Sequence, residues 1–442
     1  MSTYVPNPRV RLPQRPGAPA NVVIRGARIL DPAAGIDREG DLVVRDGVIG
    51  GDPDGLEVVD ATGLTIIPGL VDVHVHLRTP GKEHAEDIAT GTASAAAGGV
   101  VTVLAMPNTQ PPTDSPSILG SLLDRAAREA VVPTGFIPAI TVGQMGDQLT
   151  EHGDLAEAGA AALSDDGVPV ANASVMRRAL QYQKAADLLF TLHEEDMSLS
   201  GTGVMHEGVI SARIGLAGIP GVSEAVQVAR DCSLAAYEDA RIHICHVSAR
   251  ETVEEIRLAK ARGVSVTAEV TPHHLLLTDQ VVGDDPDPAK FKMNPPLRGS
   301  DDREALIEAL IDGTLDCIAT DHAPHPADEK ENPFAAAPFG VIGLETAFAA
   351  CHTELVVGGR MDLSDLVLSM STNPARIFGL PVPSLADGAR ADLAVVDLAA
   401  TDVVGERPYA SKSTNAAFVG MQLTGQVVMT LAGGQDVYRR NA

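Results

Sequence analysis

Cysteine is scarce in this sequence. The only four are Cys232, Cys245, Cys317 and Cys351, and no two of them form a C-x-x-C pair. Such a set excludes a dense disulfide framework and favours reduced thiols packed as small apolar residues. We therefore expect a cytoplasmic protein.

Long apolar runs are also lacking. No stretch reaches the roughly 18 uninterrupted apolar residues that a membrane-spanning helix needs. Residues 1–20 hold five prolines and three arginines without an apolar core, which is not the pattern of a secretory signal. We predict a flexible or loosely docked N-terminal tail over residues 1–20.

Basic residues are few compared with acidic ones. The chain has 33 Lys and Arg against 59 Asp and Glu, a formal charge of −26 at pH 7. This balance argues against nucleic acid or an anionic membrane as a partner. It leaves a small anionic substrate open, because binding of a small molecule depends on local charge.

The order of the apolar patterns predicts the fold class. With 442 residues, the chain is long enough for one large domain and one smaller one. Residues 68–380 alternate apolar strand runs with helical segments, and eight strands in this pattern favour an α/β fold with a TIM-like (β/α)8 barrel over an open sheet. Residues 21–67 and 381–442 contain short strands, and we expect them to meet in one small β-sandwich domain built from both chain ends.

The expected elements of residues 68–380 are given by their ranges. The candidate helices are Glu86–Ala97, Ile118–Ala130, Ser223–Glu238, Arg250–Arg262, Asp302–Asp312 and Leu344–Val356. Besides the strand that ends at His74, the candidate strands are Val100–Ala105, Gly135–Ile140, Ala160–Leu163, Leu188–Leu192, Arg241–Cys245, Val264–Glu269 and Leu315–Thr320.

Two histidines, His74 and His76, close an apolar stretch that begins at Thr65. In a strand, side chains two residues apart point to the same face, so both imidazoles are aimed as two ligands of one metal ion would be. Arg78 adds a positive charge at the same end. Since such pairs also occur on solvated strands without metal, the motif alone does not decide between the two.

Further histidines and carboxylates follow other predicted strands. His193 and His246 each follow one, Asp165 and Asp166 follow Ala160–Leu163, and Asp321 follows Leu315–Thr320. Any one of these is more typical of a structural histidine or a helix cap. Together, however, four histidines and two carboxylates would converge on the C-terminal mouth of a barrel. They supply enough ligands for two divalent ions, for which zinc is the best match and manganese, cobalt or iron remain open.

Seven segments in residues 68–380 resemble, in order, those of a dihydroorotase of the amidohydrolase superfamily. They are Asp72–Arg78, Ala105–Thr109, Ser164–Gly167, Thr271–Leu275, Asn294–Arg298, Ala319–His325 and Gly343–Glu345.

The resemblance implies a set of metal ligands. His74, His76 and Asp321 would hold one ion, and His193 and His246 a second. Many relatives bridge the two ions with a carboxylated lysine, but this chain has no lysine there and resembles the subgroup that uses aspartate, with Asp166 as the bridge. The implied cofactor is one or two Zn²⁺ per subunit, with two favoured.

The resemblance also implies substrate contacts. Arg78, Asn108 and His325, beside His76, match residues that hold the substrate carboxylate. Asn294 and the backbone of Phe339 and Gly340 match the part that contacts the pyrimidine ring. For Asn108 and Asn294 the alternative is turn formation beside proline. His273 and His274 are expected to pack around the site, and Asp165 is expected to serve a turn or cap.

The implied reaction is the reversible cyclisation of N-carbamoyl-L-aspartate to L-dihydroorotate plus water, a step of pyrimidine biosynthesis. A metal-bound hydroxide would attack the ring amide in the hydrolytic direction, with Asp321 as catalytic proton carrier. We expect a homo-oligomer, and a complex with aspartate carbamoyltransferase is compatible with the sequence.

Two alternatives stay open from the sequence. One is another cyclic amidase, a hydantoinase or allantoinase, although these generally lack the arginine two residues after H-x-H and the Asn-Pro-Pro-Leu-Arg segment. The other is a non-catalytic scaffold homologue bound to aspartate carbamoyltransferase. Such homologues typically lose metal ligands, whereas this chain keeps them.

Overall fold

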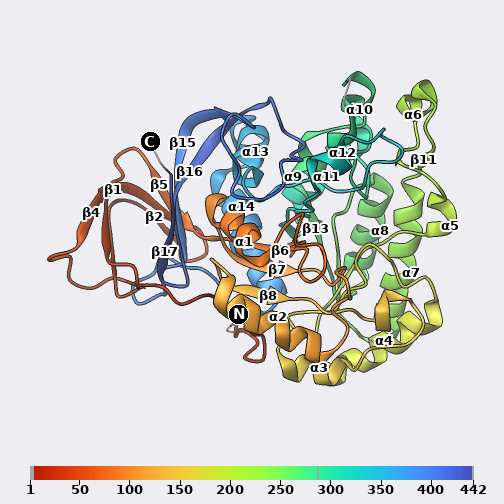
Figure 1. Ribbon diagram of the computed structural model, residues 1–442, viewed down its shortest axis with the longest axis horizontal. Helices are drawn as coiled ribbons and strands as arrows, with labels where there is room; N and C mark the ends of the chain where they lie inside the picture. The colour runs from red at the N-terminus through yellow and green to blue at the C-terminus, as the bar shows by residue number, and fades with distance from the viewer. Residues whose placement is uncertain (1–3, 286–287, 441–442) are drawn as a thin grey trace.

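The computed structural model describes residues 4–285 and 288–440, and its interior contains two short parallel sheets (Figure 1). One joins β6 (Leu70–Val75), β7 (Val100–Ala105) and β8 (Thr134–Phe136) in that order. The other joins β9 (Phe190–Leu192), β12 (Ile242–Ile244), β13 (Val266–Val270) and β14 (Cys317–Ile318). The chain is therefore α/β, as predicted, and most strands lie within the predicted ranges.

Hydrogen bonds connect these two sheets at both edges. The expected strand Ala160–Leu163 is not a regular strand, but Ala161 donates to the Phe136 carbonyl and Leu163 forms a parallel bridge with Phe190. At the other edge Val75 forms a parallel bridge with His322. The parallel segments thus follow one another in sequence order, and the last contacts the first.

Helices follow most of the parallel strands. α1 (Ile88–Ala97), α2 (Pro116–Glu129), α7 (Val222–Glu238), α8 (Arg250–Ala261) and α11 (Ser300–Asp312) lie close to their predicted ranges. α1 begins where Asp87 and Thr90 form a reciprocal capping box. The predicted helix Leu344–Val356 is shorter, because α13 (Ala347–Cys351) passes into a π-helical segment, His352–Val357.

Several further elements within residues 68–380 were not predicted. The longest is α4 (Ala173–Ala186), which Asn172 caps. The others are the helices α3 (His152–Ala158), α5 (Met197–Ser200), α6 (Val209–Ile214), α9 (Pro272–Leu276), α10 (Gln280–Asp284), α12 (Ala327–Lys330), α14 (Leu363–Val367) and α15 (Asn373–Ile377), and the strand pair β10 (Met205–His206) and β11 (Gly218–Ile219).

Apolar residues fill the space inside and outside the parallel strands. Every residue of β6 and β7 is buried, as expected for strands covered on both faces. Alternate residues Val71 and Val73 of β6 belong to a cluster with Leu104 of β7. A larger cluster packs the strands against the surrounding helices. This packing fixes the strand ends, and with them the polar residues that follow.

Strands from both chain ends form one mixed sheet, at the left of Figure 1. Its members are β1 (Val22–Asp31), β2 (Ile36–Arg45), β3 (Val48–Ile49), β4 (Glu57–Asp60), β5 (Thr65–Pro68), β15 (Leu393–Val403), β16 (Gln422–Ala432) and β17 (Gln435–Arg439). β5 pairs antiparallel with β15, which joins the two ends, and the sheet has its own apolar cluster. The hydrogen bonds join all of these strands in one sheet. Whether the sheet folds over into two facing layers, as a β-sandwich requires, stays a prediction, and so do the domain boundaries. Residues 441–442 lie outside the described residues.

The prediction of a loosely docked tail is wrong for residues 4–20. Asn7, Arg11 and Arg15 donate backbone hydrogen bonds to the carbonyls of Gly379, Gly159 and Ala130. Val10 and Leu12 also pack against the cluster inside the parallel strands. Two apolar residues among the prolines and arginines anchor this segment, and the composition of the segment hid them. Residues 1–3 lie outside the described part of the chain.

Two other sequence features can be compared with the structure. All four cysteines are free and buried, which confirms that they pack as small apolar residues. None of the helices in the described residues combines the length and the apolar character that a membrane span requires.

Candidate active site

The six candidate metal ligands lie at one end of the parallel strands. His74 is the fifth residue of β6, and His76 is the first residue after this strand. His193, His246 and Asp321 come shortly after β9, β12 and β14. Asp166 follows the irregular segment 160–163. Because all of these segments run in the same direction, their C-terminal ends meet at one place.

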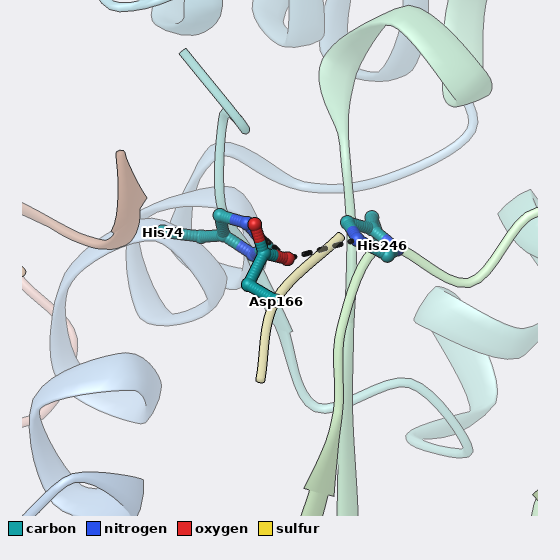
Figure 2. Close-up of side chains that lie close together, drawn as sticks. All are labelled: His74, Asp166 and His246. Carbon is teal, nitrogen blue, oxygen red and sulfur yellow. Dashed lines mark ion pairs between the residues drawn. The ribbon is translucent and has the colours of Figure 1, made fainter. Parts of the chain in front are cut away.

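Asp166 lies at the centre of the six. Its Oδ1 is 3.4 Å from His74 Nε2, 3.7 Å from His246 Nε2 and 4.0 Å from His193 Nδ1. Its Oδ2 is 3.7 Å from His76 Nε2. Figure 2 shows the Asp166 carboxylate between the rings of His74 and His246. One carboxylate is therefore surrounded by four imidazoles from three segments, the ends of β6, β9 and β12.

Asp321 completes the cluster on the side of His74 and His76. Its Oδ1 is 2.9 Å from His76 Nε2 and 3.6 Å from His74 Nε2. On the other side, His193 Nδ1 is 3.0 Å from His246 Nε2. The arrangement thus has two halves, with Asp166 between them.

Several buried atoms at this place have no hydrogen-bond partner. They include His74 Nε2, Asp166 Oδ1 and His246 Nδ1. Leaving a buried polar atom unpaired costs about 1–3 kcal/mol, so three together indicate that a ligand is needed. Imidazole nitrogens and carboxylate oxygens within 4.8 Å of one another match the donor set of a divalent transition metal. The residues present therefore fit a metal ion.

The electrostatics of the cluster favour charge separation. Burial lowers the pKa of His74, but Cys245, Glu269 and Asp166 raise it, and the net pKa is well above the ordinary value. Burial raises the pKa of Asp166, yet His74 and His246 bring it well below the usual range. The positive charge of a protonated imidazole thus offsets the negative charge of the neighbouring carboxylates, and a metal ion that binds here would release such protons.

Three residues of the site have left-handed backbones. The φ angles of Arg78, His246 and Asp321 are 55°, 34° and 49°. Such conformations cost about 1–3 kcal/mol for residues other than glycine and cluster at functional sites. The fold accepts this strain at the strand ends, where it directs these side chains.

The residues expected to hold a substrate carboxylate lie next to the cluster. Arg78 Nη2 is 3.2 Å from His325 Nε2, and its Nε donates to the Pro324 carbonyl. Asn108 accepts from His76 Nδ1 at 2.7 Å and donates to Asp166 Oδ2 at 2.9 Å. Asn108 therefore links two candidate ligands and does more than form a turn.

The residues expected to contact the pyrimidine ring are hydrogen-bonded to other residues beside the cluster. The Phe339 carbonyl is 2.8 Å from His325 Nε2, and the Gly340 amide donates to the Lys292 carbonyl. Gly340 has a φ of 132°, which favours glycine. Asn294 donates to Glu195 Oε2 at 2.9 Å.

Residues without an expected ligand role are held by other partners. Asp165 accepts from the backbone amides of Ile140 and Thr141, which are 25 and 24 residues away, so its side chain joins two segments and does not cap its own turn. His274 lies 2.8 Å from Thr271 Oγ1 and 3.0 Å from the Pro295 carbonyl, so it packs. His273 is buried beside it, and burial lowers its pKa to about 4.

Two carboxylates in contact with the candidate ligands were not predicted. Glu195 Oε2 is 3.2 Å from His193 Nε2, and Glu269 Oε1 is 2.7 Å from His74 Nδ1. Glu269 belongs to β13, whose apolar character hid it, although a glutamate within a buried strand is itself a signal. Glu195 could have been noticed from its position two residues after His193.

Comparison with known proteins decides the family. A family model described as Dihydro-orotase-like matches residues 63–252. A dihydroorotase of Anaeromyxobacter dehalogenans is 47% identical over 95% of this chain and 98% of its own length. A dihydroorotase of Geobacter sp. is 46% identical over 95% of this chain and 99% of its own. The chain belongs to the dihydroorotase family.

Solved structures of similar shape are cyclic amidases of another name. The L-hydantoinase (dihydropyrimidinase) from Arthrobacter aurescens has a TM-score of 0.84 and 26% identity, covering 96% of this chain and 97% of that one. The chain is much more similar in sequence to the dihydroorotases than to this hydantoinase. Within the dihydroorotase family, the chain is an enzyme of the cyclic amide hydrolase type.

Proposed function

We propose that this chain is a zinc-dependent dihydroorotase that catalyses the reversible cyclisation of N-carbamoyl-L-aspartate to L-dihydroorotate plus water in pyrimidine biosynthesis. The observation that carries the proposal is the Asp166 carboxylate among four imidazoles, with Asp321 beside them. The high identity to dihydroorotases over nearly the whole chain supports the substrate.

The six ligands would hold one or two zinc ions per subunit, with two favoured. His74, His76 and Asp321 form one half of the cluster, and His193 and His246 form the other. Asp166 lies between the halves and would serve both. When bound, zinc would polarise the amide carbonyl and lower the pKa of water so that a nucleophile exists at neutral pH.

Asp321 would carry the proton. In the hydrolytic direction its carboxylate accepts a proton from the attacking water and returns it to the leaving ring nitrogen. Contacts with His76 and His74 outweigh the effect of burial and lower the pKa of Asp321 to about 2, so the carboxylate is ionised and ready to accept. In the biosynthetic direction the same transfers run backwards.

Arg78 and its neighbours would orient the substrate. The Arg78 guanidinium is buried and offers a planar pair of donors to a carboxylate. Its Nη2 lies 3.2 Å from His325 Nε2, and Asn108 contacts His76 nearby. Asn294 and the backbone of Phe339 and Gly340 would contact the pyrimidine ring. Asn294 contacts Glu195 beside His193, and the Phe339 carbonyl contacts His325 beside Arg78.

The fold is proposed in finer terms as well. We infer a (β/α)8 barrel over residues 68–380, supported by hydrogen bonds that run from each parallel segment to the next and from the last to the first. Residues 21–67 and 381–442 would form a β-sandwich domain. This is supported by one apolar cluster shared by Ile24, Val44, Val395 and Met429, from strands distant in the order of the sheet.

Partners and location follow from the same proposal. The substrate is a small molecule, and a homo-oligomer in the cytoplasm, with or without aspartate carbamoyltransferase, fits a pyrimidine enzyme. Four buried free thiols support a reducing compartment.

A parallel assay separates this proposal from its alternatives. The purified chain, loaded with zinc, is offered L-dihydroorotate, hydantoin and allantoin at equal concentrations. We expect turnover of dihydroorotate far above that of the other two. Preference for hydantoin or allantoin would replace the proposed substrate, and a zinc-loaded chain without any turnover would support the scaffold alternative.

A further inference from the structure

A buried carboxylate, Glu269, lies behind His74 on the side away from Asp166. Its Oε1 is 2.7 Å from His74 Nδ1 and its Oε2 is 3.1 Å from His243 Nε2. All three side chains are fully buried. Each oxygen of this carboxylate therefore has its own imidazole partner.

The strand geometry explains how the three residues meet. Thr267 and Glu269 are two residues apart in β13 and share a face. His243, in the neighbouring strand β12, pairs with Thr267, and its Nδ1 is 2.8 Å from Thr267 Oγ1. Glu269 is thus held from behind by His243, while its other oxygen contacts His74 of β6.

This contact selects the state of the His74 ring. An ionised carboxylate can only accept hydrogen bonds, so at 2.7 Å the hydrogen of His74 is on Nδ1. In the neutral ring, Nε2 then keeps a lone pair, and this atom lies 3.4 Å from Asp166 Oδ1 and 3.6 Å from Asp321 Oδ1. A lone pair facing two carboxylate oxygens is suited to a cation between them.

We propose that Glu269, held in place by His243, is a positioning residue that fixes the tautomer and the orientation of His74 for metal binding. This inference rests on the proposed zinc site. Groups that orient a metal-ligating histidine typically change metal affinity by about 10- to 100-fold when they are removed. The alternative is that Glu269 only satisfies buried imidazoles, in which case its loss would affect stability but not zinc affinity.

The test is the zinc affinity of Glu269→Gln, measured by competition with a chelating dye in the absence of substrate. We expect zinc binding weakened by about 10- to 100-fold, with KM for dihydroorotate unchanged once zinc is saturating. The matched control is Glu224→Gln, which alters an equally buried carboxylate whose partners are Ser248, Ala249 and Arg298. This control should keep the wild-type zinc affinity.

Three results would overturn the inference: wild-type zinc affinity in a folded Glu269→Gln protein, an equal loss in Glu224→Gln, or a raised KM at saturating zinc. If Glu269→Gln does not fold, His243→Phe replaces it, because this change removes the support behind Glu269 and leaves both Glu269 and His74 in place. A folded His243→Phe protein should bind zinc less tightly than wild type, and unchanged affinity would again refute the role. Because these affinities need no turnover, a wild-type chain that binds zinc but does not hydrolyse dihydroorotate would instead contradict the proposed function.

Discussion

Two carboxylates and four imidazoles, all buried, occupy a very small space at the ends of the parallel strands. Asp166 alone lies within 4.0 Å of four histidine nitrogens. Such a cluster is costly to bury unless its charges and lone pairs are matched. At the residue scale, a bound divalent cation is the simplest way to match them.

Replacing Asp321 by asparagine keeps the shape of the side chain but removes the proton acceptor. We expect kcat to fall by about 10²- to 10⁴-fold while the thermal midpoint changes little. Steady-state assays with zinc content measured in parallel would check this. Asp316→Asn, which alters a carboxylate that accepts from Lys260 and the Ala268 amide, should keep near-normal kcat. Near-normal turnover of Asp321→Asn would remove Asp321 as proton carrier.

Arg78→Ala tests how the substrate is held. Removing a buried guanidinium that pairs with a carboxylate should cost about 1.5–3 kcal/mol of binding, or about 10- to 100-fold in kcat/KM. We expect most of this loss in KM, since Arg78 contacts no reacting atom in the proposal. Arg125→Ala, at a part-exposed ion pair with Glu129, serves as the control. An unchanged kcat/KM in Arg78→Ala would refute the contact.

At the scale of elements, the positions of the strands were predictable and some of their surroundings were not. The apolar runs located β7, β9 and β12, and the histidines after β9 and β12 belong to the cluster around Asp166. Segment 160–163 precedes Asp166 without being a regular strand. Its four residues are too few to reveal from sequence whether they form a ladder or a single bridge.

Helix α4 and Glu269 show two different reasons for missed features. α4 buries Val175, Met176, Ala179 and Leu180, a helical spacing that was present in the sequence and not used. Glu269 depends on contacts with strands β6 and β12, which are about 195 and 26 residues away in the chain. Only the folded arrangement brings those partners together.

Lys330 of α12 connects two loops beside the site, and replacing it tests how much these contacts stabilise the fold. Its ammonium donates to the carbonyls of Ala289, Lys292 and Pro338, which the change Lys330→Met would leave unpaired. We expect the free energy of unfolding to drop by about 3 kcal/mol, measured by urea denaturation. Lys290→Met, which removes one part-exposed ion pair with Asp285, should cost less than about 1 kcal/mol. Equal effects would show that the three carbonyl contacts contribute little.

At the scale of the whole molecule, the two chain ends are joined to the parallel strands in different ways. β5 continues directly into β6 and pairs with β15, so the terminal sheet is connected to the strand that carries His74. Residues 4–20 instead run across the structure and place Leu12 against its interior. The short strands at both ends predicted that these ends meet, whereas the packing of Leu12 was not predicted because it depends on residues far apart in the chain.

Leu12→Ser tests whether the N-terminal segment contributes to stability. Exposing or removing a packed leucine side chain should lower the free energy of unfolding by about 1–3 kcal/mol, and the thermal midpoint by several degrees. Val5→Ser, at a residue that is 74% exposed, should leave the midpoint unchanged. If both variants melt like wild type, the docked segment is not an integral part of the fold.

The most direct test of the whole account is the zinc content and dihydroorotate turnover of the purified chain before and after chelation. We expect one or two zinc ions per chain, loss of turnover when they are removed, and recovery when zinc is returned. Turnover that persists in a metal-free chain would contradict the account.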